Sequence, residues 1–216
     1  MKNFEVCPKR HYEIDLAKNV KEPEGEQLLW GNAVHKAMAE RCGPNRTPLP
    51  TDITHAMPHA EAWAAKCIGK GGGIYVEESL AISKNFTATG NFDSDTWLRV
   101  KGDFIKVVGD VALAVDWKTG KILEDSVQLA LTAACIFAKW PQVQAVRSTY
   151  VWLKDDCESS ETFFRGDMQN MWRSIWPRIE AMENAHKFTN YPPTPSGMCM
   201  RWCAVKSCPH NGKSSR

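Results

Sequence analysis

Residues 102–121 read GDFIKVVGDVALAVDWKTGK, and this stretch decides the fold that we expect. The dipeptide Gly109-Asp110 separates two apolar runs, and Gly followed by Asp is a favoured two-residue loop of a β-hairpin. Counting outward from that loop places Asp103 directly opposite Asp116. Lys118 comes two residues after Asp116, so both side chains project from the same face of the strand. The stretch therefore predicts a hairpin that carries two carboxylates and one ammonium group on one face.

Carboxylates that face each other on a hairpin need an explanation, because opposed side chains lie about 5 Å apart and like charges repel. A divalent cation between them would remove the repulsion, and carboxylate oxygens suit Mg²⁺ or Mn²⁺. Lys118 beside such an ion could polarise a phosphate or help to orient an attacking water. The alternative interpretation is that Asp103 only begins a strand and Asp116 only ends one. A bulge in either strand would also change their pairing.

Outside the hairpin, the spacing of hydrophobic residues predicts further helices and strands. A Pro/Thr-rich loop is expected over residues 44–54. The predicted elements are helices at 24–42, 55–68, 124–140 and 167–188, the last with Pro177 as a possible kink, and strands at 74–82, 96–100, 103–108, 111–117, 145–153 and 161–165. This order predicts an α/β fold in which a central mixed β-sheet is flanked by helices. The length suits a single domain over residues 1–216.

The composition is that of an ordinary globular protein, with 43% hydrophobic and 24% charged residues. A net charge of +2, from 27 basic and 25 acidic residues, excludes a chain that coats nucleic acid over its whole surface. A DNA-binding surface must then be a local patch. No apolar run is long enough to span a bilayer, and the N-terminal stretch lacks the apolar segment of a secretory signal. We therefore expect an intracellular, cytoplasmic protein without a membrane partner.

Asp103 followed by DWKTG at 116–120 resembles the motif of the PD-(D/E)XK nuclease superfamily, in its RecB-like branch. Three further stretches are similar to this branch and follow its order along the chain. They are His35 within GNAVHKAMAE, Gln128 at the start of a helix, and Cys7 within CPKRHY. The stretch around Cys7 resembles the N-terminal motif of the RecB-like CRISPR adaptation nucleases and of the AddB nuclease domain. The resemblance covers nearly the whole chain and implies a restriction-endonuclease-like core.

The resemblance also implies roles for single residues of the predicted metal site. His35, Asp103, Asp116 and the main-chain carbonyl of Trp117 would bind Mg²⁺ or Mn²⁺. Asp103, Asp116 and Lys118 would be the catalytic residues. Without the resemblance, a histidine at this position of a helix is more typical of an ordinary core or surface residue than of a metal ligand. The side chain of Trp117 alternates away from Asp116 and Lys118, so we expect it in the core.

Gln128 would contact the substrate, although the Tyr that the family places four residues later is Thr132 here. Taken by itself, Gln128 is also typical of an ordinary amide on a helix surface. Glu77 and Glu78 precede the hairpin, where some members of the family have another acidic ligand. The sequence does not decide which of the two points inward, so neither belongs to the predicted site.

Eight cysteines are present, and Cys199, Cys203 and Cys208 crowd together near the C-terminus. In a reducing compartment such thiols stay free or bind metal rather than form disulfides. In the similar nucleases the counterparts of Cys7 and of the tail cysteines hold a 4Fe–4S cluster, which would staple the two chain ends here. The tail spacing, C-x₃-C-x₄-C, departs from the family's C-x₂-C-x₅-C. Zinc, with His210 as a further ligand, and free thiols are the alternatives.

These features together predict a Mg²⁺- or Mn²⁺-dependent deoxyribonuclease that hydrolyses phosphodiester bonds. The resemblance favours an exonuclease acting on DNA ends in recombination or repair. A phage origin and a recombination protein as partner are further expectations from the resemblance. The alternative is a non-catalytic DNA- or partner-binding protein that retains the nuclease fold and a structural metal held by cysteines.

Overall fold

The computed structural model describes residues 1–122 and 126–213 of the chain. By its internal contacts the chain divides into two compact units. Unit 1 consists of Met1–Gly25 together with Trp172–Arg216, and unit 2 consists of Glu26–Met171. Both chain ends therefore belong to the same unit. The assignment of residues 1–216 to one nuclease domain stays a prediction.

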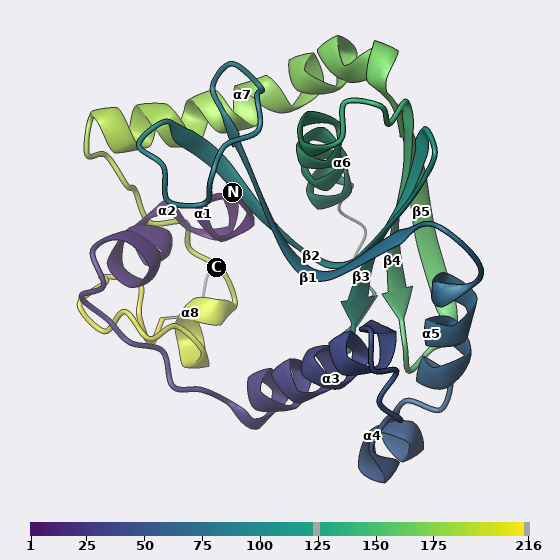
Figure 1. Ribbon diagram of the computed structural model, residues 1–216. Coiled ribbons are helices and arrows are strands. Elements are labelled where there is room, and N and C mark those ends of the chain that lie inside the picture. Colours follow the sequence, from purple (N-terminus) through teal and green to yellow (C-terminus); the bar gives the residue numbers. More distant parts are fainter. Residues whose placement is uncertain (123–125, 214–216) are drawn as a thin grey trace. The chain divides into compact units, whose positions relative to one another are not determined.

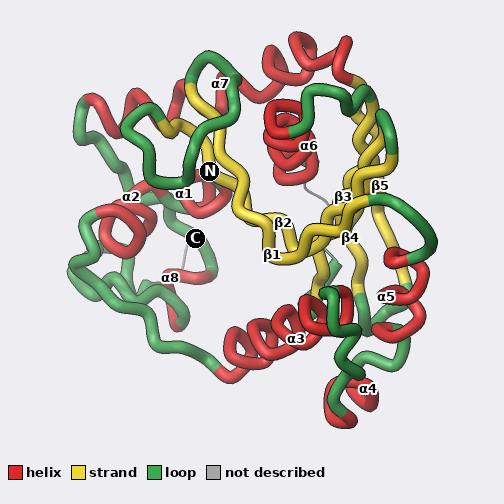
Figure 2. Tube along the Cα trace, in the orientation of Figure 1, coloured by secondary structure: helices red, strands yellow, loops and turns green. Residues whose placement is uncertain are grey.

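Unit 2 contains a five-stranded mixed sheet in the order β1-β2-β3-β4-β5. Strands β3 and β4 are parallel, and every other neighbouring pair is antiparallel. Helix α6 (Val127–Lys139) provides the crossover that parallel neighbours require. The strands are β1 (Gly73–Ser83), β2 (Thr96–Val108), β3 (Val111–Lys118), β4 (Ala145–Trp152) and β5 (Cys157–Phe164). The predicted α/β fold with a mixed sheet between helices is thus confirmed (Figures 1 and 2).

Helices cover both faces of this sheet (Figure 1). Helix α6 packs on one face, whereas α3 (Glu26–Cys42), α4 (Thr51–Ala56) and α5 (Ala60–Ile68) pack on the other. The core between α3 and the sheet includes Phe104 and Trp117, which are 0% and 1% exposed. The prediction that the Trp117 side chain lies in the core is confirmed.

The predicted hairpin register is confirmed along β2 and β3. The first pair is Val108↔Val111, and the pairing continues without a bulge to Phe104↔Val115. Gly109 has φ 59°, the left-handed conformation that glycine adopts readily and that a type II′ loop requires at its first position. Extending this register by one residue places Asp103 opposite Asp116.

Several predicted boundaries were wrong. Residues 96–100 and 103–108 form one continuous strand, because the pairing with β1 carries through Lys101 and Gly102. Helix α4 begins inside the predicted loop 44–54, where Asp52 in the first turn complements the helix dipole. The segment 55–68 is split between α4 and α5, and β5 begins at Cys157 rather than at residue 161. Residues 124 and 125 of the predicted helix 124–140 lie outside the described residues.

Unit 1 is built from short helices and from most of one long helix. The N-terminal stretch, for which the sequence predicted no element, forms α1 (Lys2–Val6), α2 (Pro8–His11) and a π-helix (Tyr12–Leu16). Helix α7 (Met168–Lys187) crosses the boundary between the units and contains Pro177, and a 3₁₀ turn (Arg165–Asp167) precedes it. Helix α8 (Met198–Arg201) lies in the Cys-rich tail. In the part of the chain that the structure describes, no helix combines the length and apolarity needed to cross a membrane.

Candidate active site

Three side chains from three different elements converge in unit 2. Asp103 lies on β2, His35 on α3 and Glu77 on β1, and one ligand atom of each lies within 4.8 Å of those of the others. His35 Nδ1 is 3.2 Å from Asp103 Oδ2. All three side chains are partly buried. One imidazole nitrogen and two carboxylates form a donor set that can hold a divalent cation.

Glu77 reaches this group through an irregularity in β1. The pairing with β2 passes through Val76↔Phe104 and resumes at Glu78↔Gly102. Glu77 lies between these pairs with φ 52°, a left-handed conformation that is unfavourable for a residue with a side chain. Non-glycine residues in this region cost about 1–3 kcal/mol and cluster at functional sites. Glu77 also pairs with Lys101.

Asp116 and Lys118 lie beside this group on β3. Lys118 Nζ is 2.8 Å from Asp116 Oδ1, and Gln128 donates from Nε2 to Asp116 Oδ2. Asp116 is therefore held from both sides, by a cation and by an amide. Its carboxylate lies outside the set of three converging ligands. Asp103 instead accepts a hydrogen bond of 2.9 Å from the backbone N–H of Trp117, which ties the two strands together at the site.

Tyr150 on β4 supports both partners of Asp116. Its ring lies under Lys118, with Nζ 4.7 Å from the ring centroid. Its hydroxyl donates to Gln128 Oε1 at 3.4 Å, so the amide must turn its NH₂ group toward Asp116. Thr132 stands where the family motif has tyrosine, and its hydroxyl donates to the Gln128 carbonyl at 2.9 Å. Thr132 is buried, so it does not take the place of a substrate-facing tyrosine.

Burial, charges and hydrogen bonds at the site shift two pKa values upward. Burial raises the pKa of Asp116, the negative charge of Asp103 adds to the effect, and Lys118 opposes it. The pKa of His35 is raised mainly by its hydrogen bond to Asp103, against the effect of burial. Asp103 contributes to both shifts, and a bound divalent cation would offset that contribution.

The structure brings together His35, Asp103, Asp116, Lys118 and Gln128, all of which the sequence singled out. The metal-binding role of the Trp117 carbonyl stays a prediction. Sequence reasoning left out Glu77, because alternation separates Glu77 from Glu78 but does not give the register of β1 against β2, which places Glu77 opposite Asp103. Glu78 instead pairs with Lys139 at the end of α6. No local signal in the sequence identifies Tyr150, which reaches the site from a distant strand.

The cysteines expected to hold a cluster all lie in unit 1 and are all half-buried: Cys7, Cys199, Cys203 and Cys208. The sulfur of Cys7 accepts a hydrogen bond from the Thr194 N–H at 3.4 Å, and that of Cys199 accepts one from the Ser196 N–H at 3.4 Å. Among the described residues, these sulfurs do not form a group of three within 4.8 Å of one another. A zinc ion would need its thiolates closer, roughly 3.8 Å apart from Zn–S bonds of about 2.3 Å in a tetrahedron.

No family model matches the chain, and no curated protein matches it. Among solved structures, it is similar to the crystal structure of SSO0001, with 13% sequence identity and a TM-score of 0.40 over 97% of this chain and 84% of that chain. At this identity and TM-score the likeness bears on neither the fold nor the function.

Proposed function

We propose that this chain is a divalent-metal-dependent DNA nuclease. One observation carries the proposal. The ligand atoms of His35, Glu77 and Asp103 converge, and the hairpin that contributes Asp103 also carries the Asp116–Lys118 pair. A purely structural hairpin has no need for opposed carboxylates. The sequence resemblance to the RecB-like nucleases supports the choice of DNA as substrate.

The donor set fits the ion that this function needs. Carboxylate oxygens with one imidazole suit Mn²⁺, and they suit Mg²⁺ when waters complete the shell. His35, Glu77 and Asp103 would hold the ion. Asp116 interacts electrostatically with Asp103 and His35, so its charge would also act on the bound ion. When bound, the ion would supply Lewis acidity toward a phosphate and make a water more acidic.

The remaining residues of the site would act on the phosphate and on each other. Lys118 would stabilise negative charge that develops on the scissile phosphate. The Tyr150 ring and Asp116 restrict the ammonium group to one position, which reduces the entropy lost on substrate binding. Gln128 would orient Asp116 and could turn to the substrate when Asp116 takes another partner.

The finer features of the function rest on the resemblance. They are exonuclease action at DNA ends, a role in recombination or repair with a recombination protein as partner, and a phage origin. A 4Fe–4S cluster on the four cysteines of unit 1 belongs with them. Its donor chemistry fits, since four thiols lie in one compact unit and two already accept N–H hydrogen bonds of the kind that tune such clusters. Zinc on the same cysteines, with His210 as a further ligand, is the alternative.

The test is a cleavage assay on end-labelled linear DNA and on closed circular DNA, with Mg²⁺, Mn²⁺ or EDTA. We expect metal-dependent loss of linear DNA, and a fall of about 10²-fold or more in rate for Lys118→Ala. Lys154→Ala is the matched control, because Lys154 is exposed in the turn between β4 and β5. Cleavage at the unaltered rate by Lys118→Ala would show that the assignment is wrong, and DNA binding without cleavage would favour the non-catalytic alternative.

A further inference from the structure

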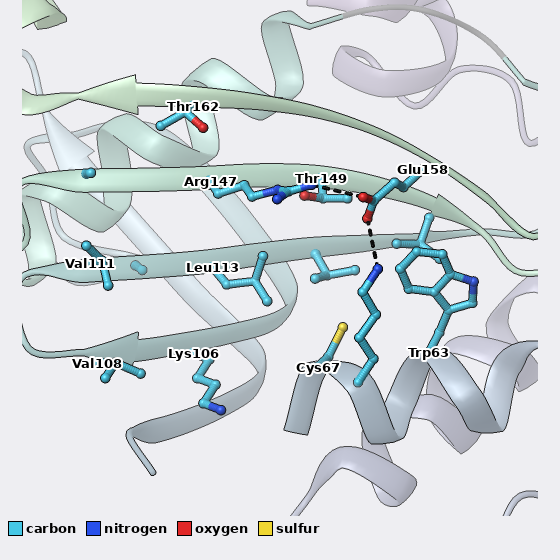
Figure 3. Close-up of a pocket in the computed structure, with 15 residues that line it drawn as sticks. Trp63, Cys67, Lys106, Val108, Val111, Leu113, Arg147, Thr149, Glu158 and Thr162 are labelled. Atoms are coloured by element: carbon cyan, nitrogen blue, oxygen red, sulfur yellow. Dashed lines mark hydrogen bonds and ion pairs between the residues drawn. The ribbon is translucent and has the colours of Figure 1, made fainter. Parts of the chain in front are cut away.

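A cavity of unit 2 lies on the face of the sheet that α5 covers (Figure 3). Side chains alternate along β3, so Asp116 points to Gln128 of α6, while Leu113, together with Lys106 of β2, lines this cavity. Its volume is about 510 Å³, within the roughly 300–1,000 Å³ that small-molecule sites occupy. Helix α5 forms one wall, and strands β2 to β5 form the floor.

The floor of the cavity is apolar and incompletely covered. Val108 and Val111 are 46% and 47% exposed, although they lie on interior strands of the sheet. Leu113, Val115 and Ala145 extend this apolar surface toward α5. Val108 and Val111 are the last pair before the hairpin loop, and an exposed apolar surface of this kind costs free energy in water and can mark a binding site.

The rim of the cavity is positively charged. Lys66, Lys106 and Arg147 line it, against one carboxylate, that of Glu158. Glu158 is already shared, since it lies 2.9 Å from Arg147 and 3.7 Å from Lys66 (Figure 3).

Lys106 is a cation of the rim with an N–H group left to donate to a ligand. Its ammonium group donates to the carbonyls of Ile68 at 2.6 Å and Lys70 at 3.3 Å, which leaves one of its three N–H groups. No carboxylate among the described residues pairs with it. The cavity therefore combines an apolar floor with a surplus of fixed positive charge.

We infer that this cavity binds a small organic anion with an apolar body, such as a medium-chain carboxylate. The apolar body would lie on Val111 and Leu113, and the anionic group would take the free N–H of Lys106. Charge complementarity selects this class, because a neutral apolar molecule would leave the surplus charge unpaired and a cation would be repelled. This site is separate from the proposed nuclease site and does not depend on it.

The experiment is isothermal titration calorimetry of the full chain with four probes: octanoate, 1-octanol, octylammonium and butyrate. We expect octanoate to bind with one-to-one stoichiometry, and each of the other probes to bind at least about tenfold more weakly. Equal affinity for octanoate and 1-octanol would overturn the proposal, since the charge would then play no part. Absence of octanoate binding would overturn it as well.

Two substitutions of opposite charge at Val111 test whether octanoate binds in this cavity. Val111 is exposed, so Val111→Asp and Val111→Lys should both fold, which circular dichroism can verify. We expect Val111→Asp to weaken octanoate binding about tenfold or more and Val111→Lys to retain it. Lys106→Met keeps the apolar stem, removes the charge, and should also weaken binding. Identical octanoate affinities in the two Val111 variants would contradict the inference.

Discussion

At the scale of single residues, Glu77 and Glu78 have opposite fates although they are neighbours in sequence. Glu77 adopts a left-handed φ of 52° and joins His35 and Asp103, whereas Glu78 keeps its pairing with Gly102 and binds Lys139. A backbone strained in this way persists where the surrounding structure holds it. The unchanged register on either side places Glu77 opposite Asp103, so the two side chains share one face of the sheet.

These opposite fates predict a difference in metal affinity. We expect Glu77→Gln to weaken Mn²⁺ binding by at least about tenfold, the scale that even outer partners of a metal contribute. Glu78→Gln is the matched control and should bind Mn²⁺ as the unaltered protein does. Electron paramagnetic resonance of free Mn²⁺ measures both. Equal losses in the two variants would mean that Glu77 is not a ligand.

A second prediction at this scale concerns the pKa of His35 in metal-free protein. The hydrogen bond to Asp103 raises it above the usual 6.5, and Asp103→Asn should lower it. Because the folded-state pKa is raised, the contribution to stability is complete below pH 6.5 and is lost as pH rises through the folded-state value. Metal binding must displace the same proton, so Mn²⁺ affinity should rise over that range.

Nuclear magnetic resonance titration of the imidazole signals measures the pKa of His35. The exposed loop residue Asp110 provides the control, since Asp110→Asn should leave the titration unchanged. A His35 titration that does not respond to Asp103→Asn would contradict the geometry of the site.

At the scale of elements, helix α6 positions Gln128 at its start and is anchored at its end by Arg165. The guanidinium of Arg165 donates to the carbonyls of Phe137 at 2.8 Å, Trp140 at 3.0 Å and Val143 at 2.8 Å. A cation at a helix C-terminus also complements the helix dipole. This anchor connects the segment after β5 to the helix that supports the candidate site.

Removal of this anchor should destabilise the fold. We expect Arg165→Ala to lower the free energy of unfolding by roughly 2 kcal/mol, in line with charged hydrogen bonds to buried carbonyls. Arg165→Lys keeps the charge but not the forked donor geometry, so its loss should be smaller. Urea denaturation followed by circular dichroism compares the two. A larger loss for Lys than for Ala would mean that the hydrogen bonds do not stabilise α6.

At the scale of the whole molecule, the two units are built differently. Unit 2 has a sheet with a continuous apolar core, whereas unit 1 joins both chain ends through short helices and contains the four half-buried cysteines. A bound cluster would contribute most of its binding free energy to the folding of unit 1.

This division predicts a local effect of cysteine substitution. In protein purified without oxygen, Cys199→Ser should lower the iron content and increase amide hydrogen exchange in unit 1, while β1 to β5 stay protected. Cys157→Ser, a half-buried cysteine of unit 2, should leave the iron content unchanged. Iron-free protein with the same exchange pattern before and after Cys199→Ser would contradict the cluster.

The sequence alone determined the hairpin and the residues opposed on it, because a two-residue loop and strand alternation depend on neighbouring residues only. The same local signals were sufficient for the mixed sheet and for Trp117 in the core. Tertiary structure alone decided that Glu77 rather than Glu78 joins His35, and that Tyr150 supports Lys118 and Gln128. These contacts join elements far apart in the chain and depend on how those elements pair and pack. Local periodicity carries no information on either.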